Sequence, residues 1–441
     1  MLRLSPVSLR CGQSPMCSPN FPRDACAERV PQRTSGVMSA DLLLTLNAGS
    51  STVKIALFEV APSCTRRAAK GLIDFRGNPP SFRITEGATT FDVNLKTNIS
   101  DIRGVMAEAF GWLATHFDMG RVTAVGHRVV HGGDAFAGPV RIDDVTLEAI
   151  DQLTMLAPLH QPQSVRLIRA IRHLRPDLEQ AASFDTAFHR TNAEVVRRFA
   201  IPRALNDQGI KRYGFHGLSY KYVAGELARR APDLASGKIV VAHLGSGASL
   251  CALDVGVSQD TSMGFSTLDG IPMATRCGAL DAGVLLHLLG PLGRSPAEIS
   301  DTLYHKSGLF GISGISADTR ELLASDRLEA RQAIEAFTFR IAGEIARLAA
   351  TLGGLDGVVF TAGIGENQPQ IRAEICNRLT WLGANIDAAA NARNAEKISK
   401  GSSRIAALVI PTDEEQVIAD EALSVLKQEG VSHGSERLSR G

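Results

Sequence analysis

Three segments of the chain combine glycine with small hydroxyl residues directly after an apolar run of the kind that forms a β-strand. They are Leu42–Thr52, Ile239–Ser249 and Val358–Asn367. Glycine lets backbone N–H groups turn toward an anion, because no Cβ stands in the way. Serine and threonine hydroxyls add further hydrogen-bond donors. Three such turns, spread over most of the chain, predict a nucleotide that is held from several sides between two similar halves.

Two arginines stand in short apolar segments next to glycines, where a mere surface charge would be unusual. Arg128 lies in the segment 126–133 and Arg276 in the segment 273–278. The planar fork of a guanidinium suits the oxygens of phosphate and carboxylate groups. Judged by residue type alone, each of these arginines could equally be one half of a structural ion pair. Arg320 is a weaker candidate of the same kind.

Histidines and carboxylates supply the other candidate chemistry. His216 is the most suggestive histidine, because the glycines on both sides expose it. Asp185 and Glu414 each follow a short strand, where active sites of α/β proteins usually lie. Either carboxylate could bind Mg²⁺, act as a base or simply cap a structure. The remaining candidate histidines, each more typical of a hydrogen-bonded structural residue, are His127, His131, His160 and His243.

Several common kinds of site have no signature in the sequence. There is no Gly-x-x-x-x-Gly-Lys-[Ser/Thr] loop, and no Gly-x-Gly-x-x-Gly opens a helix after a strand. The seven cysteines are scattered without a Cys-x-x-Cys pair, which is typical of reduced thiols in the cytoplasm. The formal net charge of +1 offers no basic field for nucleic acid. No run of about 20 apolar residues is present, so no membrane-spanning helix is expected.

Stretches typical of strands alternate with stretches typical of helices, which indicates an α/β fold. The clearest helix, over residues 326–352, repeats apolar residues at steps of three and four and ends at Gly353 and Gly354. The likeness of the first two glycine segments suggests a duplicated domain with a cleft between the copies. Strands are expected at 42–46, 53–60, 122–130, 182–184, 357–361 and 407–410, with a hairpin from 238, and further helices at 163–175 and 416–427.

A chain of 441 residues is long enough for two domains. We expect domain I to comprise residues 41–188 with a C-terminal helix over 416–430, and domain II to comprise residues 189–415, with a hinge near 186–190. Residues 1–40 hold five prolines and no sustained period, which predicts a disordered N-terminal extension. We favour Met38 as the true start over a targeting peptide.

Taken together, nine motifs in this order resemble the acetate kinase family. The resemblance runs from about Leu43 to Leu423 and implies membership of the sugar kinase, actin and heat-shock chaperone ATPase superfamily. That superfamily has two duplicated ribonuclease H-like domains with a nucleotide cleft between them. The motifs are Asn47–Lys54, Gly126–Gly133, Leu156–His160, Phe184–His189, Tyr213–Gly217, His243–Gly245, Thr275–Gly278, Thr361–Asn367 and Pro411–Glu415.

The resemblance implies a cytoplasmic homodimer that transfers a phosphoryl group from ATP to acetate with Mg²⁺ or Mn²⁺, giving ADP and acetyl phosphate. Acetate is already a good nucleophile, so the difficulty is that an anion must approach a polyanion. Catalysis should therefore consist of positioning and charge neutralisation. By the resemblance, Arg128 and Arg276 clamp acetate and the transferring phosphoryl group. His216 hydrogen-bonds the phosphoryl oxygens, and His160 assists.

The resemblance also assigns the residues around these groups. Asp185 and Glu414, with Asn47, would organise the metal, and Arg128, Val129 and Pro272 would line the acetate pocket. The residues expected to contact the nucleotide are Ser50, Thr52, Lys54, His243, Leu244, Gly245, Ser246, Gly247, Asp318, Thr319, Arg320, Gly363, Ile364, Gly365, Glu366 and Asn367.

The chain departs from the family pattern in ways that bear on these expectations. Ser246 replaces an asparagine in the second glycine turn, which affects nucleotide affinity or the preferred base. Asp413 replaces the asparagine before Glu414 and adds negative charge near the expected metal. A propionate or butyrate kinase of the same fold is the alternative, because one methylene group is worth only about 1–3 kcal/mol in an apolar pocket. A chaperone-type ATPase would need a partner-binding domain, for which the chain after Val431 is too short.

Overall fold

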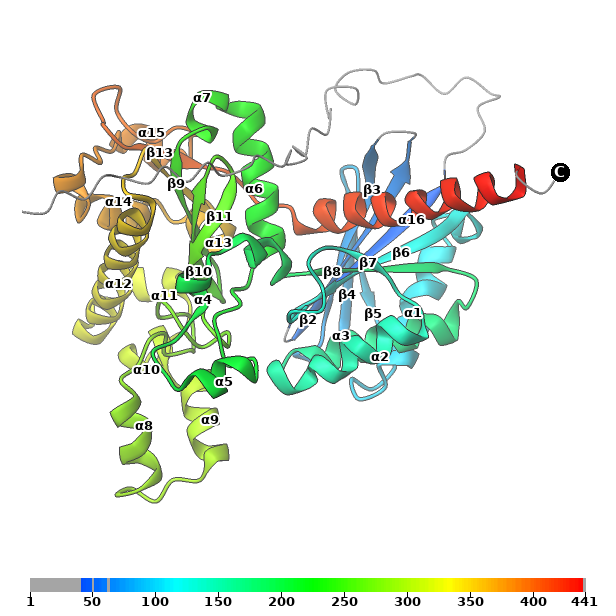
Figure 1. Ribbon diagram of the computed structural model, residues 1–441, viewed down its shortest axis with the longest axis horizontal. Helices are drawn as coiled ribbons and strands as arrows, with labels where there is room; N and C mark the ends of the chain where they lie inside the picture. The colour runs from blue at the N-terminus through cyan, green and yellow to red at the C-terminus, as the bar shows by residue number, and fades with distance from the viewer. Residues whose placement is uncertain (1–40, 50, 62–63, 439–441) are drawn as a thin grey trace, which may run out of the picture.

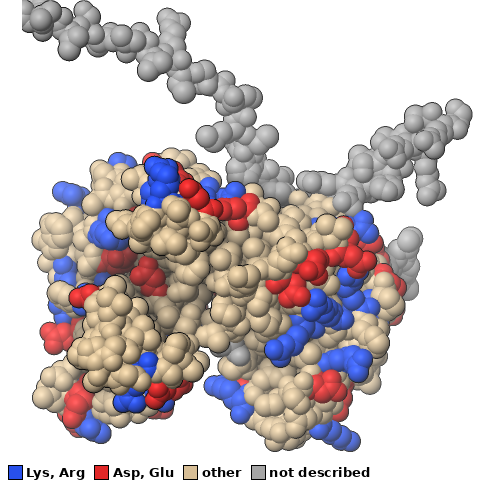
Figure 2. All heavy atoms as spheres, turned by 60° about the horizontal axis from the view of Figure 1, so that its bottom comes forward, with Lys and Arg blue, Asp and Glu red and all other residues tan. Residues whose placement is uncertain are grey.

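The computed structural model describes residues 41–49, 51–61 and 64–438, with side chains up to Lys427. The expected N-terminal extension over residues 1–40 lies outside the described residues. The described chain forms two β-sheets, each covered by helices (Figure 1). Figure 2 shows a hollow between the two lobes, and charges of both signs are interspersed over this face. In the described part of the chain, no helix is both long and apolar enough to cross a membrane.

The first sheet has eight strands in the order β5-β4-β3-β2-β1-β6-β8-β7. Strand β1 pairs antiparallel with β2 and parallel with β6, which in turn pairs parallel with β8. The strands are β1 (Leu42–Ala48), β2 (Thr52–Val60), β3 (Thr65–Asp74), β4 (Ser81–Glu86), β5 (Thr89–Asn94), β6 (Val122–Val129), β7 (Val140–Arg141) and β8 (Glu179–Phe184).

Helices cover both faces of the first sheet. Helices α1 (Ile102–Ala114) and α3 (Gln161–Leu174) pack on one face, and α2 (Asp144–Gln152) lies beside α3. Helix α16 (Glu414–Leu438), from the C-terminal end of the chain, packs on the other face through Ala419 and Ala422. Gly126 of β6 makes this contact close, because a Cβ there would lie 2.7 Å from the side chain of Ile418.

The second sheet repeats the pairing pattern of the first. Strand β9 pairs antiparallel with β10 and parallel with β12, just as β1 pairs with β2 and β6. The strands are β9 (Lys238–Leu244), β10 (Ala248–Asp254), β11 (Val257–Thr261), β12 (Gly357–Thr361) and β13 (Ala406–Val409), in the order β11-β10-β9-β12-β13. This repeat supports the duplicated α/β organisation expected from the glycine segments.

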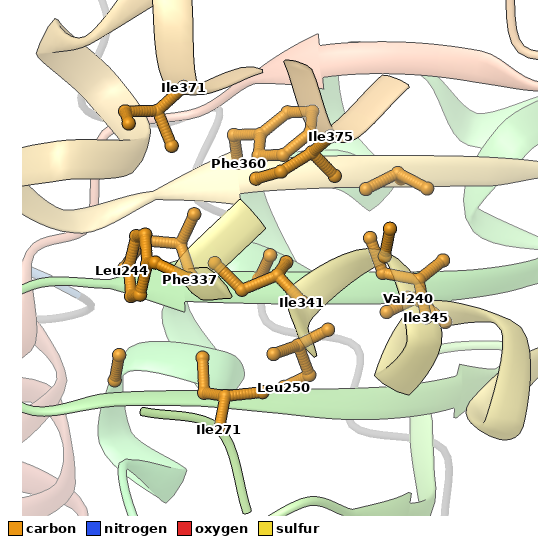
Figure 3. Close-up of a cluster of buried hydrophobic side chains, with 14 of the residues drawn as sticks. Val240, Leu244, Leu250, Ile271, Phe337, Ile341, Ile345, Phe360, Ile371 and Ile375 are labelled. Atoms are coloured by element: carbon orange, nitrogen blue, oxygen red, sulfur yellow. The ribbon is translucent and has the colours of Figure 1, made fainter. Parts of the chain in front are cut away.

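The largest core lies between the second sheet and α12 (Leu328–Leu352). Phe337, Ile341 and Ile345 of α12 point at Val240, Leu250 and other sheet residues (Figure 3). Gly353 ends the helix in the left-handed conformation, with φ 66°. On the opposite face, α6 (Gly217–Arg230) packs through Tyr220, Val223 and Leu227.

The remaining helices of the described chain are short. The 3₁₀ turns are η2 (Met119–Arg121), η3 (Leu153–Leu156), η4 (Ala187–Thr191) and η5 (Thr380–Leu382). The α-helices are α4 (Glu194–Arg197), α5 (Arg203–Asp207), α7 (Pro232–Ala235), α8 (Ala282–Leu289), α9 (Pro296–His305), α10 (Gly308–Ser313), α11 (Thr319–Leu323), α13 (Ala362–Asn367), α14 (Pro369–Asn377) and α15 (Ala388–Ala392).

The structure confirms both hairpins and the strands expected around 122–130, 357–361 and 407–410, and it corrects two details. The third glycine segment is a helix rather than a tight turn, because α13 begins directly after β12, at Ala362 with φ 63°. Helix α16 begins at Glu414 rather than at residue 416. Cys251, Cys277 and Cys376 are free thiols, as expected for reduced cysteines.

Candidate active site

Arg128 and Asp185 form a forked ion pair at the ends of two parallel strands. The Nε of Arg128 donates to both carboxylate oxygens of Asp185 at 3.1 and 3.2 Å, and its Nη2 donates to Oδ2 at 2.5 Å. The Nη1 of Arg128 donates to the carbonyl of Ala48 at 3.0 Å. The Asp185 side chain is only 1% exposed. Arg128 is therefore one half of a structural ion pair, the alternative that the sequence analysis could not exclude.

Burial raises the pKa of Asp185, although the charge and hydrogen bonds of Arg128 oppose this shift. The negative charge of Glu414 raises the pKa of Asp185 further. Burial also works to raise the pKa of Glu414 itself, but the positive charges of Lys54 and Arg128 outweigh it and hold that pKa at about 2. The two carboxylates thus lie within electrostatic reach of each other, with Arg128 near both.

The first glycine turn meets the start of α16 through Asn47. The side-chain amide of Asn47 donates to Glu414 at 2.8 Å and to Glu415 at 2.7 Å. Lys54 lies one pairing position from the turn, opposite Asn47, and its Nζ is 3.7 Å from Glu415. Glu415 was not singled out by the sequence analysis, although its place next to Glu414 was a signal. Ser50, a predicted phosphate contact, lies outside the described residues.

The fit of a divalent metal ion can be judged from these side chains. Asp185, Glu414 and Glu415 bring three negative charges, and Arg128 and Lys54 bring two positive charges. The cluster therefore has an excess of carboxylate oxygens, the ligands that Mg²⁺ prefers. No preformed group of three or more His, Cys, Asp or Glu residues that could hold a metal ion occurs within the described ranges. The residues fit a cation shared with a phosphate ligand rather than an all-protein cage.

Asp413, which was expected to add negative charge near the metal, is paired instead. Its Oδ1 accepts a hydrogen bond from Arg67 of β3 and another from the backbone N–H of Gln416 at 3.1 Å. The positive charge of Arg67, in the first sheet, therefore balances the negative charge of Asp413.

His216 occupies a left-handed conformation, with φ 58°, at the start of α6. Its Nδ1 is hydrogen-bonded to the hydroxyl of Ser249 at 2.8 Å, and that hydroxyl is also hydrogen-bonded to the phenol of Tyr220. The His216 ring stacks on the ring of His243, with centroids 4.2 Å apart. Burial and the neighbouring positive groups hold the pKa of His216 well below its usual value, so the ring is neutral.

Arg276 differs from Arg128, because among the described residues no carboxylate lies within 4 Å of its guanidinium. Its Nη1 donates to the carbonyl of Thr267 at 3.1 Å. Burial lowers the pKa of Arg276, and the positive charge of Arg128 adds to this effect. Both arginines act on His160, whose pKa burial and these charges lower to about 4. His160 is thus a neutral side chain within electrostatic reach of both cations.

The second glycine turn lies next to these groups. A Cβ placed on Gly247 would be 3.4 Å from Nε2 of His216 and 3.7 Å from both Nη atoms of Arg276. The carbonyl of Ser246 accepts a hydrogen bond from the backbone of Ala274 at 3.2 Å. On the other side of the turn, a Cβ on Gly245 would be 3.7 Å from the Cβ of Ala362 at the start of α13. The second and third glycine segments are therefore neighbours.

The third segment and the region near 318 are held by internal hydrogen bonds. The side-chain amide of Asn367 donates to the carbonyl of Gly363 at 3.0 Å, and Glu366 accepts from the backbone of Thr412 at 3.1 Å. Ile364 packs against the main core, and Gly365 is buried. Asp318 and Arg320 pair with each other at the exposed start of α11, where Thr319 is buried.

Val129, predicted to line the acetate pocket, and the next residue, Val130, lie in different hydrophobic clusters. Val129 is fully buried in a cluster with Ile168 and Phe184. Val130, which directly follows β6, belongs to the cluster that contains Phe215 and Met273, neighbours in sequence of His216 and of Pro272. Because side chains alternate along an extended chain, Val130 is the valine expected on the face of Arg128.

Known proteins resemble this chain over most of its length. The model of the acetokinase family matches residues 42–420. An acetate kinase of Rhodopseudomonas palustris is 50% identical over 390 residues, which cover 86% of this chain and 97% of that protein. A Francisella tularensis propionate kinase structure is 36% identical with a TM-score of 0.82, covering 87% of this chain and 100% of that one. A Porphyromonas gingivalis acetate kinase structure is 33% identical with a TM-score of 0.77, covering 88% of this chain and 100% of that one.

Proposed function

The chain belongs to the acetokinase family, and from this premise we propose that it transfers the γ-phosphoryl group of ATP to acetate, giving ADP and acetyl phosphate, and also catalyses the reverse reaction. The single observation that carries the proposal is the position of Arg276. Its guanidinium has no carboxylate partner among the described residues and lies with Nε2 of His216 beside Gly247. A partly buried, uncompensated guanidinium at a glycine turn is suited to a bound anion.

In this reaction an oxygen of acetate attacks the γ-phosphorus while the bond from that phosphorus to the ADP oxygen breaks. Acetate is ionised at neutral pH, so no side chain has to remove a proton. Arg276 neutralises charge on the acetate and on the transferring group. The neutral His216 ring donates a hydrogen bond without carrying a charge, and such preorganised donors stabilise the charge that develops in the transition state.

Arg128 acts differently in this proposal, because Asp185 already occupies its Nε and Nη2 atoms. It contributes positive charge near His160 and fixes Asp185 in place, while Arg276 supplies the open fork. The second glycine turn, Leu244–Gly247, faces the phosphates, with His243 supporting His216 from behind. Lys54 and Thr52 approach the phosphates from the first turn, and Gly363–Asn367 with Asp318–Arg320 hold the adenosine.

The family implies a divalent metal ion, and the excess of carboxylate oxygens supports Mg²⁺. Asp185 and Glu414 would hold it, with Asn47 orienting Glu414. When bound, the ion neutralises charge on the ATP phosphates. Glu414 remains ionised at neutral pH, since the positive groups around it hold its pKa at about 2.

A propionate kinase is the second candidate, because one of the similar structures is that of a propionate kinase. The proposed acyl pocket beside Pro272 is apolar, with Val130, Phe215 and Met273 in one cluster. An apolar pocket discriminates weakly against one additional methylene group, by about 1–3 kcal/mol. Acetate is placed first because the curated relatives with higher identity are acetate kinases.

We also propose that the protein is a homodimer that associates through α8. The helix and its flanks expose large apolar side chains, an arrangement that marks interaction surfaces. Leu286 is 70% exposed and Leu292 is 55% exposed. The other exposed apolar residues of this segment are Leu280, Val284 and Leu289.

The substrate is tested by trapping the acyl phosphate with hydroxylamine. Purified protein with Mg-ATP is incubated in parallel with acetate, propionate or butyrate, and the hydroxamate is measured. The proposal predicts the highest kcat/KM for acetate. A higher value for propionate would keep the chemistry and change the substrate, whereas no hydroxamate from any acid would contradict the proposed function.

A further inference from the structure

A short chain of hydroxyl groups leads from the buried contact between α6 and the second sheet to His216. Tyr220, four residues further along α6, is hydrogen-bonded through its phenol to the hydroxyl of Ser249 on β10. The same hydroxyl is hydrogen-bonded to Nδ1 of His216 at 2.8 Å. Tyr220 and Ser249 are both 0% exposed. The chain therefore lies in the protein interior and reaches the candidate site only through the His216 ring.

The protons of this chain can be arranged in three ways. In the first, Tyr220 donates to Ser249 and Ser249 donates to Nδ1 of His216. In the second, Nδ1–H of His216 donates to Ser249, and Ser249 donates to the Tyr220 oxygen; in the third, Nδ1–H and the phenol both donate to Ser249. Among the described residues, the Tyr220 hydroxyl has no other hydrogen-bond partner than Ser249, and the Ser249 hydroxyl has none besides Tyr220 and His216. The second arrangement would thus leave the buried Tyr220 O–H without an acceptor, and the third would leave the buried Ser249 O–H without one.

An unpaired buried donor disfavours the second and third arrangements, in which the proton is on Nδ1, by at least about fivefold each. In the first arrangement every hydroxyl proton is used, and the proton of the imidazole must lie on Nε2. Burial supports the same assignment, because it raises the pKa of Tyr220 far above its usual value and keeps the phenol protonated. With Nδ1 accepting from Ser249 and the one ring proton on Nε2, the imidazole is neutral.

The Nε2 atom of His216 faces the candidate site. A Cβ on Gly247 would lie 3.4 Å from this atom and 3.7 Å from the Nη atoms of Arg276. Nε2 and the guanidinium therefore flank the same space beside the second glycine turn. A proton on Nε2 makes the ring a donor toward this space, whereas a proton on Nδ1 would present a lone pair that repels an anion.

We propose that Ser249 and Tyr220 are positioning residues that hold His216 in the tautomer protonated on Nε2, so that a neutral N–H points at the anion bound beside Arg276. The hydroxyl of Ser249 fixes the tautomer and the orientation of the ring, and the phenol of Tyr220 fixes the hydroxyl of Ser249. That this anion is the transferring phosphoryl group rests on the proposed function, whereas the tautomer itself does not.

The tautomer can be measured directly in the wild-type protein by two-bond ¹H–¹⁵N correlation spectra after labelling histidine with ¹⁵N. Comparison with His216→Gln assigns the signals of His216. The proposal predicts a protonated Nε2 and an Nδ1 with the shift of an unprotonated hydrogen-bond acceptor. A proton on Nδ1 would overturn the proposal, whether or not the protein transfers phosphoryl groups.

Kinetic constants of variants test the positioning role. Ser249→Ala should lower kcat by about 10- to 100-fold, the range typical of residues that orient a functional side chain, while KM for ATP and acetate changes less than about twofold. Ser249→Thr, which keeps the hydroxyl, should restore most of kcat, and Tyr220→Phe should give a smaller loss. The matched control is Tyr213→Phe, since the Tyr213 hydroxyl donates to the carbonyl of Gly209 at 3.0 Å, outside this chain.

The outcomes separate this proposal from the proposed function. Wild-type kcat in Ser249→Ala, or an equal loss in Tyr213→Phe, would overturn the positioning role. Absence of phosphoryl transfer in the wild-type protein would refute the proposed function but leave the tautomer to be read from the spectra. If Ser249→Ala does not fold, the wild-type spectra still decide the assignment of the proton.

Discussion

The imidazole of His216 stacks on the imidazole of His243, with ring centroids 4.2 Å apart and the planes 14° from parallel. Burial lowers the pKa of both rings, to about 4 for His243 and well below the usual value for His216. Nδ1 of His243 is hydrogen-bonded to Ser219 at 2.8 Å. The neutral ring of His243 therefore packs against the ring of His216 without adding charge. His216 can donate a hydrogen bond at neutral pH without adding charge to the site.

Replacement of His216 by Ala should lower kcat by about 100- to 1,000-fold, the usual cost of removing one preorganised donor. KM for ATP should change little, because the glycine turns remain. Steady-state kinetics at saturating acetate measure both constants. His173→Ala, at an exposed position on α3, serves as the control and should keep wild-type values. A loss confined to KM would contradict the role given to His216.

The two arginines should respond differently to truncation. Arg276→Ala should lower kcat/KM for acetate by several orders of magnitude but leave the free energy of unfolding nearly unchanged, since no described carboxylate loses its partner. Arg128→Ala should also destabilise the protein by about 3–5 kcal/mol, because Asp185 would keep a buried charge without its counter-ion. Urea unfolding measures the difference between the two variants.

The double variant Arg128→Ala/Asp185→Asn is the control for this comparison. It removes the uncompensated charge and should recover much of the lost stability, while activity stays low. Equal stability of the two single variants would show that the Arg128–Asp185 pair is not the counter-ion arrangement described above.

Glu414 and its neighbour Asp413 offer a matched pair for the metal site. Glu414→Gln should raise the Mg²⁺ concentration needed for half-maximal rate by at least about tenfold, because it removes a negative charge from the proposed ligands. Asp413→Asn should leave the Mg²⁺ requirement unchanged, since Asp413 pairs with Arg67. Rates measured against Mg²⁺ at fixed ATP give both values. The reverse order of effects would move the metal site to Asp413.

Five histidines should make the folded protein sensitive to mild acid. Burial lowers the pKa of each to about 4 in the folded protein, whereas an unfolded histidine has a pKa near ~6.5. Between these values the unfolded chain binds more protons, so the free energy of unfolding falls as pH decreases. The loss at pH 5.5 should be on the order of 1 kcal/mol per histidine. The five are His127, His131, His160, His189 and His243.

Urea unfolding at pH 7.5, 6.5 and 5.5 measures this dependence. His127→Gln should reduce the slope of the free energy of unfolding against pH by the equivalent of about one bound proton. A free energy of unfolding that stays constant from pH 7.5 to 5.5 would contradict the prediction.

The proposed dimer can be tested at α8. Leu286→Asp places a charge on an apolar face and should convert a dimer into a monomer at micromolar concentration, as measured by analytical ultracentrifugation. Val145→Asp is the control, because Val145 is 79% exposed on α2 of the other lobe. A monomeric wild-type protein, or a Leu286→Asp variant that remains dimeric, would contradict the proposed interface.

Much of the fold could be predicted from local pattern. Apolar runs that lead into glycine turns identified β1, β2, β9 and β10, and the apolar repeat of α12 with Gly353 identified its length and end. The prediction of a turn for the third glycine segment was wrong, because the sequence of Thr361–Asn367 is compatible with a turn or with a helix after the strand, and the structure has a helix. Sequence alone does not state that Ala362 takes a positive φ and starts α13 at once.

The sequence indicated which residues belong to the site better than it indicated which side chains they pair with. Arg128 and Arg276 have the same kind of local sequence, yet only Arg128 meets a buried carboxylate, contributed by a residue 57 positions away. Ser249 lies in the second glycine segment, but its partner could not be predicted, since only the fold brings His216 to it. Strand alternation, in contrast, did contain the information that Val130 rather than Val129 shares the face of Arg128.

A kinase that transfers a phosphoryl group to a carboxylic acid is distinguished from an ATPase by where the γ-phosphoryl group goes. The most direct test is a ³¹P NMR time course of the purified protein with Mg-ATP and acetate. An acetyl phosphate resonance should rise in step with ADP, with little orthophosphate, and Arg276→Ala should abolish it. ADP accompanied by an equal amount of orthophosphate, without an acyl phosphate signal, would refute phosphoryl transfer to acetate and favour an ATPase.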